Sequence, residues 1–350
     1  MVQRKHNSKS FLREGDAMAT TIKDVAKYAK LSKTTVSKYI NGGNLEPENR
    51  IAIMNAIEAL DYSPNHIARG FRNSKTFTVG VLIPTLNSMY TTTIITTVES
   101  ILEKKGYGIL VCNCNGQRDN ELGKIEFLVN KKIDGLIIMP STLEASDLIK
   151  IKKQKIPLVL LDKPIPDYNA DVVLINNADA ALRATNYLLD NGHEKIAIIC
   201  GGRGVYTSDE RKRGYCQAFK EKGLLPDPAF IKHGDFTLKN AYNTVIELMS
   251  QTPRPTAIFT TNYDTSVGAI IALNKLGVKI PDDISFIGFD DIYLSEIIKP
   301  SLTMVSQPME EIGANAAELL LRRMKNDNSD FPHTVCLDSI FEINASVLPI

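Results

Sequence analysis

Residues 21–72 read TIKDVAKYAKLSKTTVSKYINGGNLEPENRIAIMNAIEALDYSPNHIARGFR, and this stretch decides the fold of the first part of the chain. Apolar residues recur in it with helical spacing, which predicts three amphipathic helices, at 22–30, 32–41 and 47–60. Their apolar faces are expected to share one small core: Val25, Ala26, Ala29, Leu31, Val36, Ile40, Ile53, Ile57 and Leu60. We therefore expect a small all-α head over residues 21–62.

Each break between the predicted helices has a physical cause. Thr21 can cap the first helix, with Asp24 as its partner three residues later, and Ser32 can cap the second. The glycine pair that ends at Gly43 can end the second helix, because glycine adopts positive φ at low cost. Pro47 begins the third helix where no needed backbone donor is lost.

The outward face of the second helix carries Lys33, Thr34, Ser37 and Lys38. Lysine can donate hydrogen bonds to guanine edges or phosphates. Threonine can make contacts through its hydroxyl or pack against a thymine methyl. These residue types suit a helix that reads the major groove. An ordinary solvated helix face shows the same types, so the face alone does not decide.

Charge is unevenly distributed along the chain. Residues 1–75 hold 13 Lys and Arg against 7 Asp and Glu, a net of +6, whereas 76–350 hold the remaining 28 against 33, a net of −5. A basic segment neutralises backbone phosphates, which supplies most non-specific affinity for DNA. The first part of the chain is therefore the part expected to bind double-stranded DNA.

The whole of 21–72 resembles the LacI family of bacterial transcription regulators. The resemblance rests on IKDVAKYAKLSKTTVSKYING for the helix-turn-helix and YSPNHIARGFR for the hinge, in the family's order. It implies that Lys33, Thr34 and Lys38 read bases in the major groove. Other residues would mainly contact the phosphate backbone: Thr21, Ser32, Thr35, Ser37 and Asn41. In the hinge, the resemblance implies DNA contacts by Asn65, Ala68, Arg69 and Phe71.

The hinge, residues 63–75, departs from the family pattern. Isolated helices below about 12 to 15 residues are marginal in water, so we expect this short helix to order mainly on DNA. The family inserts a leucine between base steps of the minor groove; Phe71 stands at the matching position, and an aromatic wedge can also kink a step. Gly70 weakens the helix. Alternatively, Phe71 packs back on the core.

Length and composition fit a cytoplasmic protein of more than one domain. The chain has 350 residues, 43% of them hydrophobic, and no apolar run approaches the roughly 20 residues that span a bilayer. Residues 1–20 lack the apolar stretch of a secretory signal. We interpret them as a disordered leader, or as the result of an upstream start with the native one at Met18. Five scattered cysteines, Cys112 and Cys114 among them, favour reduced structural thiols over a metal site.

From residue 77 onward, short apolar runs alternate with helical segments. The runs are TVGVLIP, YGILVCN, IDGLIIMP, IPLVLLD, DVVLINN, KIAIIC, PTAIFTT and DISFIGFDD, and the helical segments are 92–105, 120–131, 179–189, 210–222, 239–249 and 263–276. Near-continuous apolar strands between helices predict parallel sheets covered on both faces. The expected fold class is α/β, with two doubly wound subdomains. The first would comprise about 76–174 and 304–336, and the second about 175–303 and 337–350.

Ligands of open α/β sheets bind outside the carboxyl ends of the strands, so the loops directly after the runs are informative. They carry a coherent set of polar and aromatic side chains: Tyr90, Asp162, Arg211, Phe236, Asn262 and Asp290. Taken singly, Asp290 could cap a helix and Arg211 could form a surface ion pair. The GGRG stretch at 201–204 resembles a phosphate cradle, but its spacing is not that of a nucleotide-binding motif.

The resemblance to the LacI family, and through it to periplasmic sugar-binding proteins, continues over 77–350. It rests on DERKRGYCQAF, FTTNYDTSVGAI and ISFIGFDD, with SLTMVSQPMEEIGANAAELLL returning to the first subdomain. By this resemblance Arg211, Asn262 and Asp290 match effector-binding positions, Phe236 matches an aromatic that stacks on the ligand, and Tyr90 lies in the opposing loop. Arginine donates to hydroxyls or a carboxylate, aspartate accepts from hydroxyls, and an aromatic face covers a sugar ring or base.

Two other classes of protein were weighed against a regulator. Doubly wound sheets also host enzymes, but the sequence has no G-x-S-x-G, Walker, H-E-x-x-H or dinucleotide motif. A periplasmic sugar-binding protein would account for 77–350 and not for the basic head. A regulator accounts for both parts of the chain.

The sequence therefore favours a homodimeric, effector-responsive transcription regulator that represses carbohydrate-use genes, with no enzyme activity and no cofactor. Two-fold symmetry predicts a near-palindromic operator. A dimer is expected because no leucine heptads follow residue 343. Arg203 and Lys163 add positive charge near the expected pocket, which favours a sugar acid or phosphorylated sugar over a neutral sugar as effector.

Overall fold

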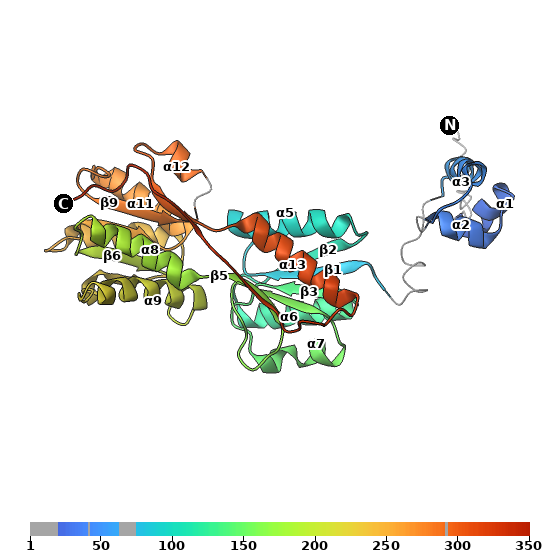
Figure 1. Cartoon of the computed structure of the whole chain (residues 1–350), viewed down its shortest axis with the longest axis horizontal. Helices are drawn as coiled ribbons and strands as arrows, with labels where there is room; N and C mark the ends of the chain where they lie inside the picture. The colour runs from blue at the N-terminus through green and yellow to red at the C-terminus, as the bar shows by residue number, and fades with distance from the viewer. Residues whose placement is uncertain (1–19, 41–42, 63–74, 291–292) are drawn as a thin grey trace, which may run out of the picture. The chain divides into compact units, whose positions relative to one another are not determined.

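The computed structural model describes residues 20–40, 43–62, 75–290 and 293–350 (Figure 1). The chain divides into two compact units, Met1–Ser74 and Lys75–Ile350. The first unit holds a helical head, and the second holds an α/β core. This division confirms the predicted fold class.

Three helices make up the described part of the head: α1 (Ile22–Tyr28), α2 (Lys33–Ile40) and α3 (Pro47–Ala59). Val25, Ala26, Val36, Ile53 and Ala56 are buried between them, and the remaining predicted core residues pack around this centre. The three predicted helices and their shared core are therefore confirmed.

The ends of the head helices follow the predicted capping, with one correction. The backbone N–H and the hydroxyl of Thr21 donate to Asp24 Oδ2 at 2.9 and 2.7 Å, and Ser32 Oγ accepts from the backbone N–H three residues later at 3.0 Å. Gly43 N donates to Lys38 O at 2.8 Å, but its φ is not in the positive region. A Cβ on Gly43 would lie 2.5 Å from Lys38 Cγ. Gly43 is therefore favoured by its close approach to Lys38 and not by positive φ, while Gly42, the other glycine of the pair, lies outside the described residues.

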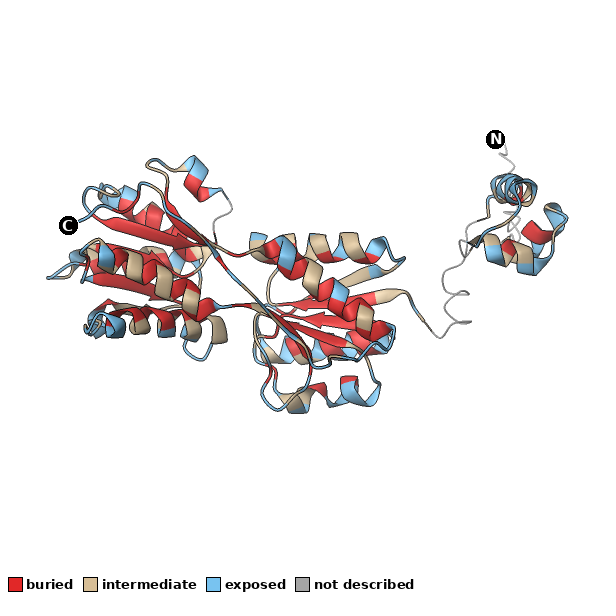
Figure 2. Cartoon of the chain, viewed as in Figure 1, coloured by how far each residue is buried: buried red, intermediate tan, exposed pale blue. Residues whose placement is uncertain are grey.

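The core contains two six-stranded sheets, and the first is parallel throughout, in the order β11-β5-β4-β3-β1-β2. Its strands are β1 (Thr78–Ile83), β2 (Gly108–Asn113), β3 (Gly135–Ile138), β4 (Leu158–Leu161), β5 (Asp171–Ile175) and β11 (Thr334–Leu337). It is covered by α5 (Met89–Glu103), α6 (Arg118–Asn130), η1 (Ala145–Leu148), α7 (Ile149–Lys153) and α13 (Met309–Met324). The central strands are buried along almost their whole length, as expected for a sheet covered on both faces (Figure 2).

The second sheet has the order β12-β10-β9-β8-β6-β7. Its strands are β6 (Ile196–Cys200), β7 (Ile231–His233), β8 (Ala257–Thr260), β9 (Ser285–Phe289), β10 (Thr303–Ser306) and β12 (Ile340–Glu342). Its helices are α8 (Asn177–Asp190), α9 (Tyr206–Glu221), η2 (Pro228–Phe230), α10 (Leu238–Ser250), α11 (Tyr263–Leu276) and α12 (Leu294–Ile297). The edge strand β12 runs antiparallel to β10, so this sheet is mixed where the sequence predicted a parallel one.

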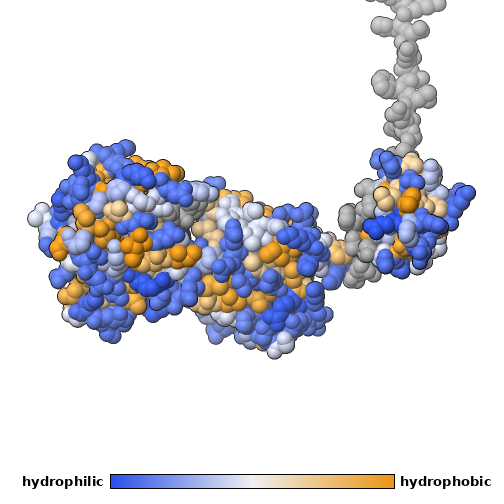
Figure 3. Space-filling view, turned by 45° about the horizontal axis from the view of Figure 1, so that its top comes forward, coloured by the Kyte–Doolittle hydropathy of each residue, from blue (hydrophilic) through white to orange (hydrophobic). Residues whose placement is uncertain are grey.

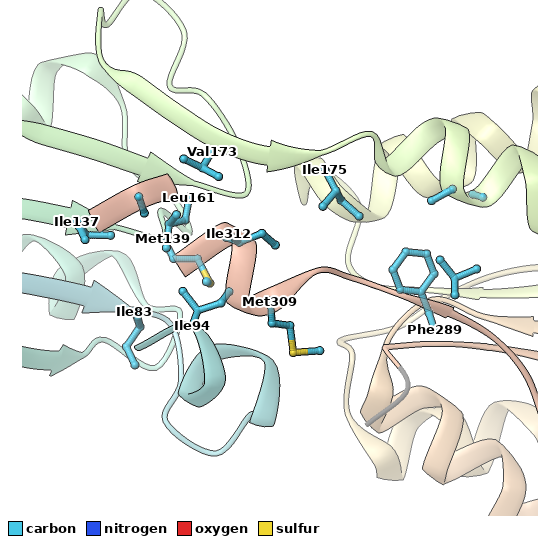
Figure 4. Packing of buried hydrophobic residues seen from close by; sticks show 14 of the residues in the cluster. Ile83, Ile94, Ile137, Met139, Leu161, Val173, Ile175, Phe289, Met309 and Ile312 are labelled. Carbon is cyan, nitrogen blue, oxygen red and sulfur yellow. The ribbon is translucent and has the colours of Figure 1, made fainter. Parts of the chain in front are cut away.

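The chain passes between the two sheets three times, from β5 to α8, from β10 to α13 and from β11 to β12 (Figure 1). One cluster of buried apolar residues continues through these crossings. Figure 4 shows Ile175 and Met309 between the residues of the first subdomain and Phe289 of the second. The strand orders of the two sheets match position by position. The third strand in each order is β4 in the first sheet and β9 in the second, so these two strands correspond.

Candidate functional site

Two aspartates stand at corresponding positions of the two sheets. Asp162 directly follows β4, and Asp290 directly follows β9. Their φ angles are 68° and 63°, a region that is costly for residues other than glycine and is enriched at functional sites. The phenol of Tyr90 donates a hydrogen bond to the Asp162 carboxylate, and Gln307 Nε2 donates to Asp290 Oδ1 at 2.6 Å. Each carboxylate is therefore held by a neighbour from its own subdomain.

Arg211 is a buried residue on α9, with 4% of its surface exposed. Its Nε donates to Asn177 Oδ1 at 2.8 Å, and a second N–H donates to the Thr261 carbonyl. Its guanidinium carbon lies 3.8 Å from the centroid of the Phe289 ring. Contacts from α8, β9 and the loop after β8 thus fix this side chain, which is the kind of support that a precise binding group needs.

Burial and neighbouring charges shift the pKa values of these side chains. Burial lowers the pKa of Arg211, and nearby carboxylates oppose that change. Burial raises the pKa of Asp290, and the Arg211 guanidinium opposes the rise. Burial also raises the pKa of Asp162, against the hydrogen bond from Tyr90. Because Asp162 and Tyr90 of the first subdomain act on Arg211 of the second, these side chains and Asp290 form one charged group drawn from both subdomains.

Phe236 and Asn262 lie in neighbouring loops of the second subdomain. Phe236 has a φ of 63°. Its ring packs so closely against Gly201 that a Cβ on this glycine would lie 2.2 Å from the ring. Asn262 caps α11, because its Oδ1 accepts from Thr265 N at 3.0 Å, and its Nδ2 donates to Phe236 O at 3.4 Å. The Asn262 side chain therefore helps to hold the loop that carries the aromatic ring.

The structure adds partners that the sequence analysis did not name. Asn177 follows β5, so the rule that selected the other loops could have found it, whereas Gln307 follows β10, which was not among the predicted apolar runs. Phe289 is the last residue of β9. Ser208 Oγ, one turn before Arg211 on α9, is buried with no hydrogen-bond partner among the described residues. This hydroxyl therefore has a donor and an acceptor unused one turn from Arg211.

Lys163 and Arg203, the two cations expected near the pocket, differ in exposure and in hydrogen bonding. Lys163 Nζ donates to Ser141 O at 2.6 Å, and the Arg203 side chain is exposed. Lys163 favours the charged form of Asp162, so Arg211 and Lys163 together balance the two carboxylates of the charged group. The geometry does not support the preference for an anionic effector.

In the head, the residues expected to read bases are on the surface. Lys33, Thr34 and Lys38 are exposed on α2, while Ser37 and Thr35 are partly buried. Five residues expected to contact DNA lie outside the described residues: Asn41, Asn65, Ala68, Arg69 and Phe71. The base-reading and hinge assignments stay predictions.

Neither a metal site nor a membrane helix is found in the described part of the chain. Cys112 and Cys114 are buried free thiols, and no group of three or more His, Cys, Asp and Glu among the described residues could hold a metal ion. None of the helices described is both long and apolar enough to cross a bilayer.

Both parts of the chain match known families. Residues 21–65 match the bacterial regulatory proteins of the lacI family, and residues 76–337 match the periplasmic binding proteins and sugar binding domain of the LacI family. The chain belongs to the LacI family. The HTH-type transcriptional repressor PurR of Vibrio vulnificus (strain CMCP6) is 34% identical over 333 residues, which cover 93% of this chain and 99% of that protein.

Solved structures of this family share the fold. The lac repressor dimer bound to operator and the anti-inducer ONPF has a TM-score of 0.82 at 22% identity, covering 94% of this chain and 99% of that one. A LacI family transcriptional regulator from Enterococcus faecium with bound ribose has a TM-score of 0.70 at 27% identity, covering 78% of this chain and 99% of that one.

Membership of the LacI family decides between the three classes of protein. A periplasmic sugar-binding protein would match the core and leave the head unexplained, whereas this chain matches family members over both. The curated relative from Vibrio vulnificus is a transcriptional repressor rather than an enzyme. The protein is therefore a DNA-binding transcription regulator, and the prediction that it is not an enzyme is confirmed.

Proposed function

We propose that this LacI family member is a homodimeric repressor that acts in the cytoplasm and controls carbohydrate-use genes. A small molecule bound between the two subdomains of the core would set its affinity for a near-palindromic operator. The observation that carries the proposal is the charged group of Tyr90, Asp162, Arg211 and Asp290, because it is drawn from both subdomains.

The chemistry of this group fits a neutral sugar. The carboxylates of Asp162 and Asp290 accept hydrogen bonds from hydroxyls, and Arg211 and Ser208 offer donors. The Phe236 ring can cover the apolar face of a sugar ring, with Asn262 holding its loop. Two cations, Arg211 and Lys163, balance the two carboxylates, which favours a neutral ligand over a sugar acid or phosphate. The ribose bound to the Enterococcus faecium regulator supports the same class.

The position of the site supports control of DNA binding. A ligand changes an equilibrium between two arrangements only by its difference in affinity for them. Arg211 and Asp290 belong to the second subdomain, and Tyr90 and Asp162 to the first, so one ligand that contacts both sets would favour one arrangement of the subdomains. That arrangement would set how well the two heads of the dimer fit the operator.

In the head, we propose that Lys33, Thr34 and Lys38 contact base edges, which agrees with their exposure on α2. Phosphate contacts are proposed for Thr21, Ser32, Thr35, Ser37 and Asn41, and hinge contacts for Asn65, Ala68, Arg69 and Phe71.

A dimer would also cover exposed apolar side chains such as Tyr293 and Ile297, which are 58% and 74% exposed.

Two linked measurements test the proposal. The full chain is screened by thermal shift with neutral sugars, sugar acids, sugar phosphates and nucleobases, since a ligand at about 100 times its dissociation constant stabilises by about 2.7 kcal/mol. Operator binding is then titrated with and without the stabilising compound. We expect a neutral sugar to stabilise the chain and to change operator affinity. A stabilising compound that leaves operator affinity unchanged would contradict the proposed control.

A further inference from the structure

The amino edge of the first sheet carries a dense group of lysines. The strands β1, β2, β3 and β4 are adjacent and parallel, so the segments that lead into them lie on one edge. These segments are 75–77, 104–107, 131–134 and 154–157. Together they contain six lysines and one aspartate, a net of +5: Lys75, Lys104, Lys105, Lys131, Lys132, Lys155 and Asp134. We call these six lysines the lysine edge.

The second sheet has the same arrangement of strands without this charge. The segments that lead into β6, β7, β8 and β9 are 191–195, 222–230, 251–256 and 277–284. They contain four Lys and Arg and four Asp and Glu, a net of zero. The fold itself therefore does not require a surplus of cations on this edge.

The ends of helices do not account for the surplus either. Several of these lysines follow the carboxyl ends of α5, α6 and α7, where a cation interacts favourably with the helix dipole. The helices α8, α9, α10 and α11 end at the corresponding edge of the second sheet, and there the cations are balanced by carboxylates. The same dipoles are present on both edges, so the difference in charge needs another cause.

Four of the six side chains of the lysine edge are free to bind a partner, because Lys75 Nζ donates to the Tyr107 hydroxyl at 3.3 Å and Lys131 Nζ lies 5.3 Å from the centroid of the Phe127 ring. Lys104, Lys105, Lys132 and Lys155 are exposed, and in the described part of the chain none of them forms an ion pair with a carboxylate. Asp134, the one carboxylate in these segments, accepts from the backbone N–H groups of residues 76 and 77 at 2.9 and 2.7 Å. Figure 3 shows a largely hydrophilic surface over the end of the first subdomain where β1 begins. Like charges placed side by side repel, and a polyanion would relieve that repulsion.

We propose that the lysine edge is a second, sequence-independent DNA surface, which binds backbone phosphates of the duplex beside the base pairs that the head reads. Four neighbouring strands about 4.8 Å apart make an edge about 14 Å wide, and that length of duplex carries about eight phosphate charges on its two strands, of which the edge faces those on one side. The chain enters the core at this edge, through Lys75. The twelve residues 63–74 that precede it can span at most about 40 Å. DNA held by the head is thus presented to the edge at a high effective concentration.

The test compares two variants of the full chain that lose the same charge. In the first, Lys104, Lys105, Lys131, Lys132 and Lys155 are changed to Gln. In the matched control, the four cations of the corresponding segments of the second sheet and Lys220, in the last turn of α9, are changed to Gln: Lys195, Lys220, Lys222, Arg254 and Lys279, all of them exposed. Binding to a mixed-sequence 40-base-pair duplex is measured by fluorescence anisotropy over a series of KCl concentrations, and thermal melting confirms that each variant is folded.

The slope of log affinity against log salt reports the number of phosphates neutralised, at about 0.9 for each contact. We expect the first variant to have a slope smaller than wild type by about 2, and the control variant to keep the wild-type slope. Equal slopes for the two variants would overturn the proposal and leave an acidic protein surface as the partner of the edge. A wild-type chain that binds no duplex would contradict DNA binding itself, and this surface with it.

Discussion

The two subdomains of the core share one order of strands but prepare the proposed effector site to different degrees. In the second subdomain, Arg211 is buried and held by Asn177, Thr261 and Phe289, and Asp290 is held by Gln307. In the first, Asp162 and Tyr90 are partly buried and hydrogen-bonded to each other. The second subdomain thus fixes its binding groups in advance, whereas the first offers a pair that can exchange its mutual hydrogen bond for contacts with a ligand.

The amino edges of the two sheets, opposite the edges that carry the proposed site, differ as well. At the amino edge of the first sheet, Arg323 and Asp171 form a buried ion pair with N···O distances of 2.6 and 3.0 Å. At that edge of the second sheet, His193 lies within 3.0 Å of both Thr256 Oγ1 and the Leu348 carbonyl oxygen, and burial lowers the pKa of this histidine. The amino edge of the first sheet thus contains a buried ion pair, whereas that of the second sheet contains a buried histidine that contacts a hydroxyl and a carbonyl.

The largest expected effect follows from that buried pair. The side chains of Arg323 and Asp171 are 3% and 0% exposed, so Arg323→Ala leaves a buried carboxylate without its partner. We expect a loss of about 3 to 5 kcal/mol in the free energy of unfolding, measured by urea denaturation. The matched control is Arg322→Ala, because Arg322 is 39% exposed in its pairs with Asp327 and Asp330 and its loss should cost about 0 to 1 kcal/mol. Similar losses for both variants would show that the buried pair has no special role.

The second prediction tests whether the second subdomain carries the prepared site. Arg211→Ala removes the cation whose charged form both carboxylates favour, so we expect the affinity for the effector to fall by about 2 to 5 kcal/mol. Ligand-free operator affinity should stay near wild type. Calorimetric titration with the compound found by thermal shift measures the affinity for the effector, and a DNA titration measures the ligand-free operator affinity.

Arg203→Ala is the control for the Arg211 variant, since Arg203 is an exposed arginine in the loop before α9. It should bind the effector like the wild type. If the two variants lost affinity equally, the buried position of Arg211 would not be what matters.

Much of the fold could be predicted from the sequence, because its strands are long apolar runs. The eight runs correspond to β1, β2, β3, β4, β5, β6, β8 and β9. The strands β7, β10, β11 and β12 were not among them. The strands β7, β11 and β12 are partly or wholly exposed, so their apolar pattern is weak, and the buried strand β10 begins with Thr303 and ends with Ser306, which leaves only two apolar residues between them. Their pairing depends on the neighbouring strand rather than on their own sequence.

The loops of the site could be selected from the sequence, but their hydrogen bonds could not. Asp162 and Asp290 were selected because each follows an apolar run. The partner of Asp290 is Gln307, which lies beside it because β10 pairs with β9, and β10 was not recognised. The bond between Arg211 and Asn177 likewise joins two helices that meet only in the folded chain. Long-range pairing of this kind is set by tertiary packing.

The third prediction concerns the aromatic part of the site. A Cβ in Gly201→Ala would lie 2.2 Å from the Phe236 ring, so the ring must move or the loops must shift. We expect a loss of about 1 to 3 kcal/mol in stability from overpacking, and weaker effector binding as the ring leaves its place. Gly202→Ala is the matched control, because the nearest atom to its Cβ is 3.4 Å away. Unchanged effector affinity in Gly201→Ala would show that Phe236 does not cover the ligand.

The smallest expected effect is a dependence of effector affinity on pH. Burial raises the pKa values of Asp162 and Asp290, so each binds a proton at a higher pH than an ordinary carboxyl does. The carboxylates accept from ligand hydroxyls only while they are ionised. Effector affinity should therefore be constant at higher pH and should fall as the pH is lowered through these raised pKa values, by at most about tenfold per pH unit for each titrating group.

Asp290→Asn sharpens this prediction, because it removes one titrating group and keeps the shape of the side chain. The affinity of the variant should be lower at neutral pH and should change less as the medium is acidified. Asp235→Asn is the control: Asp235 is exposed beside Phe236, and its hydrogen bond from Thr237 lowers its pKa, so its titration lies below that of the two buried carboxyls. Calorimetric titrations between about pH 5 and pH 8 compare the three proteins. A pH profile of Asp290→Asn that coincides with wild type would mean that the carboxylate prepared by the second subdomain does not contact the ligand.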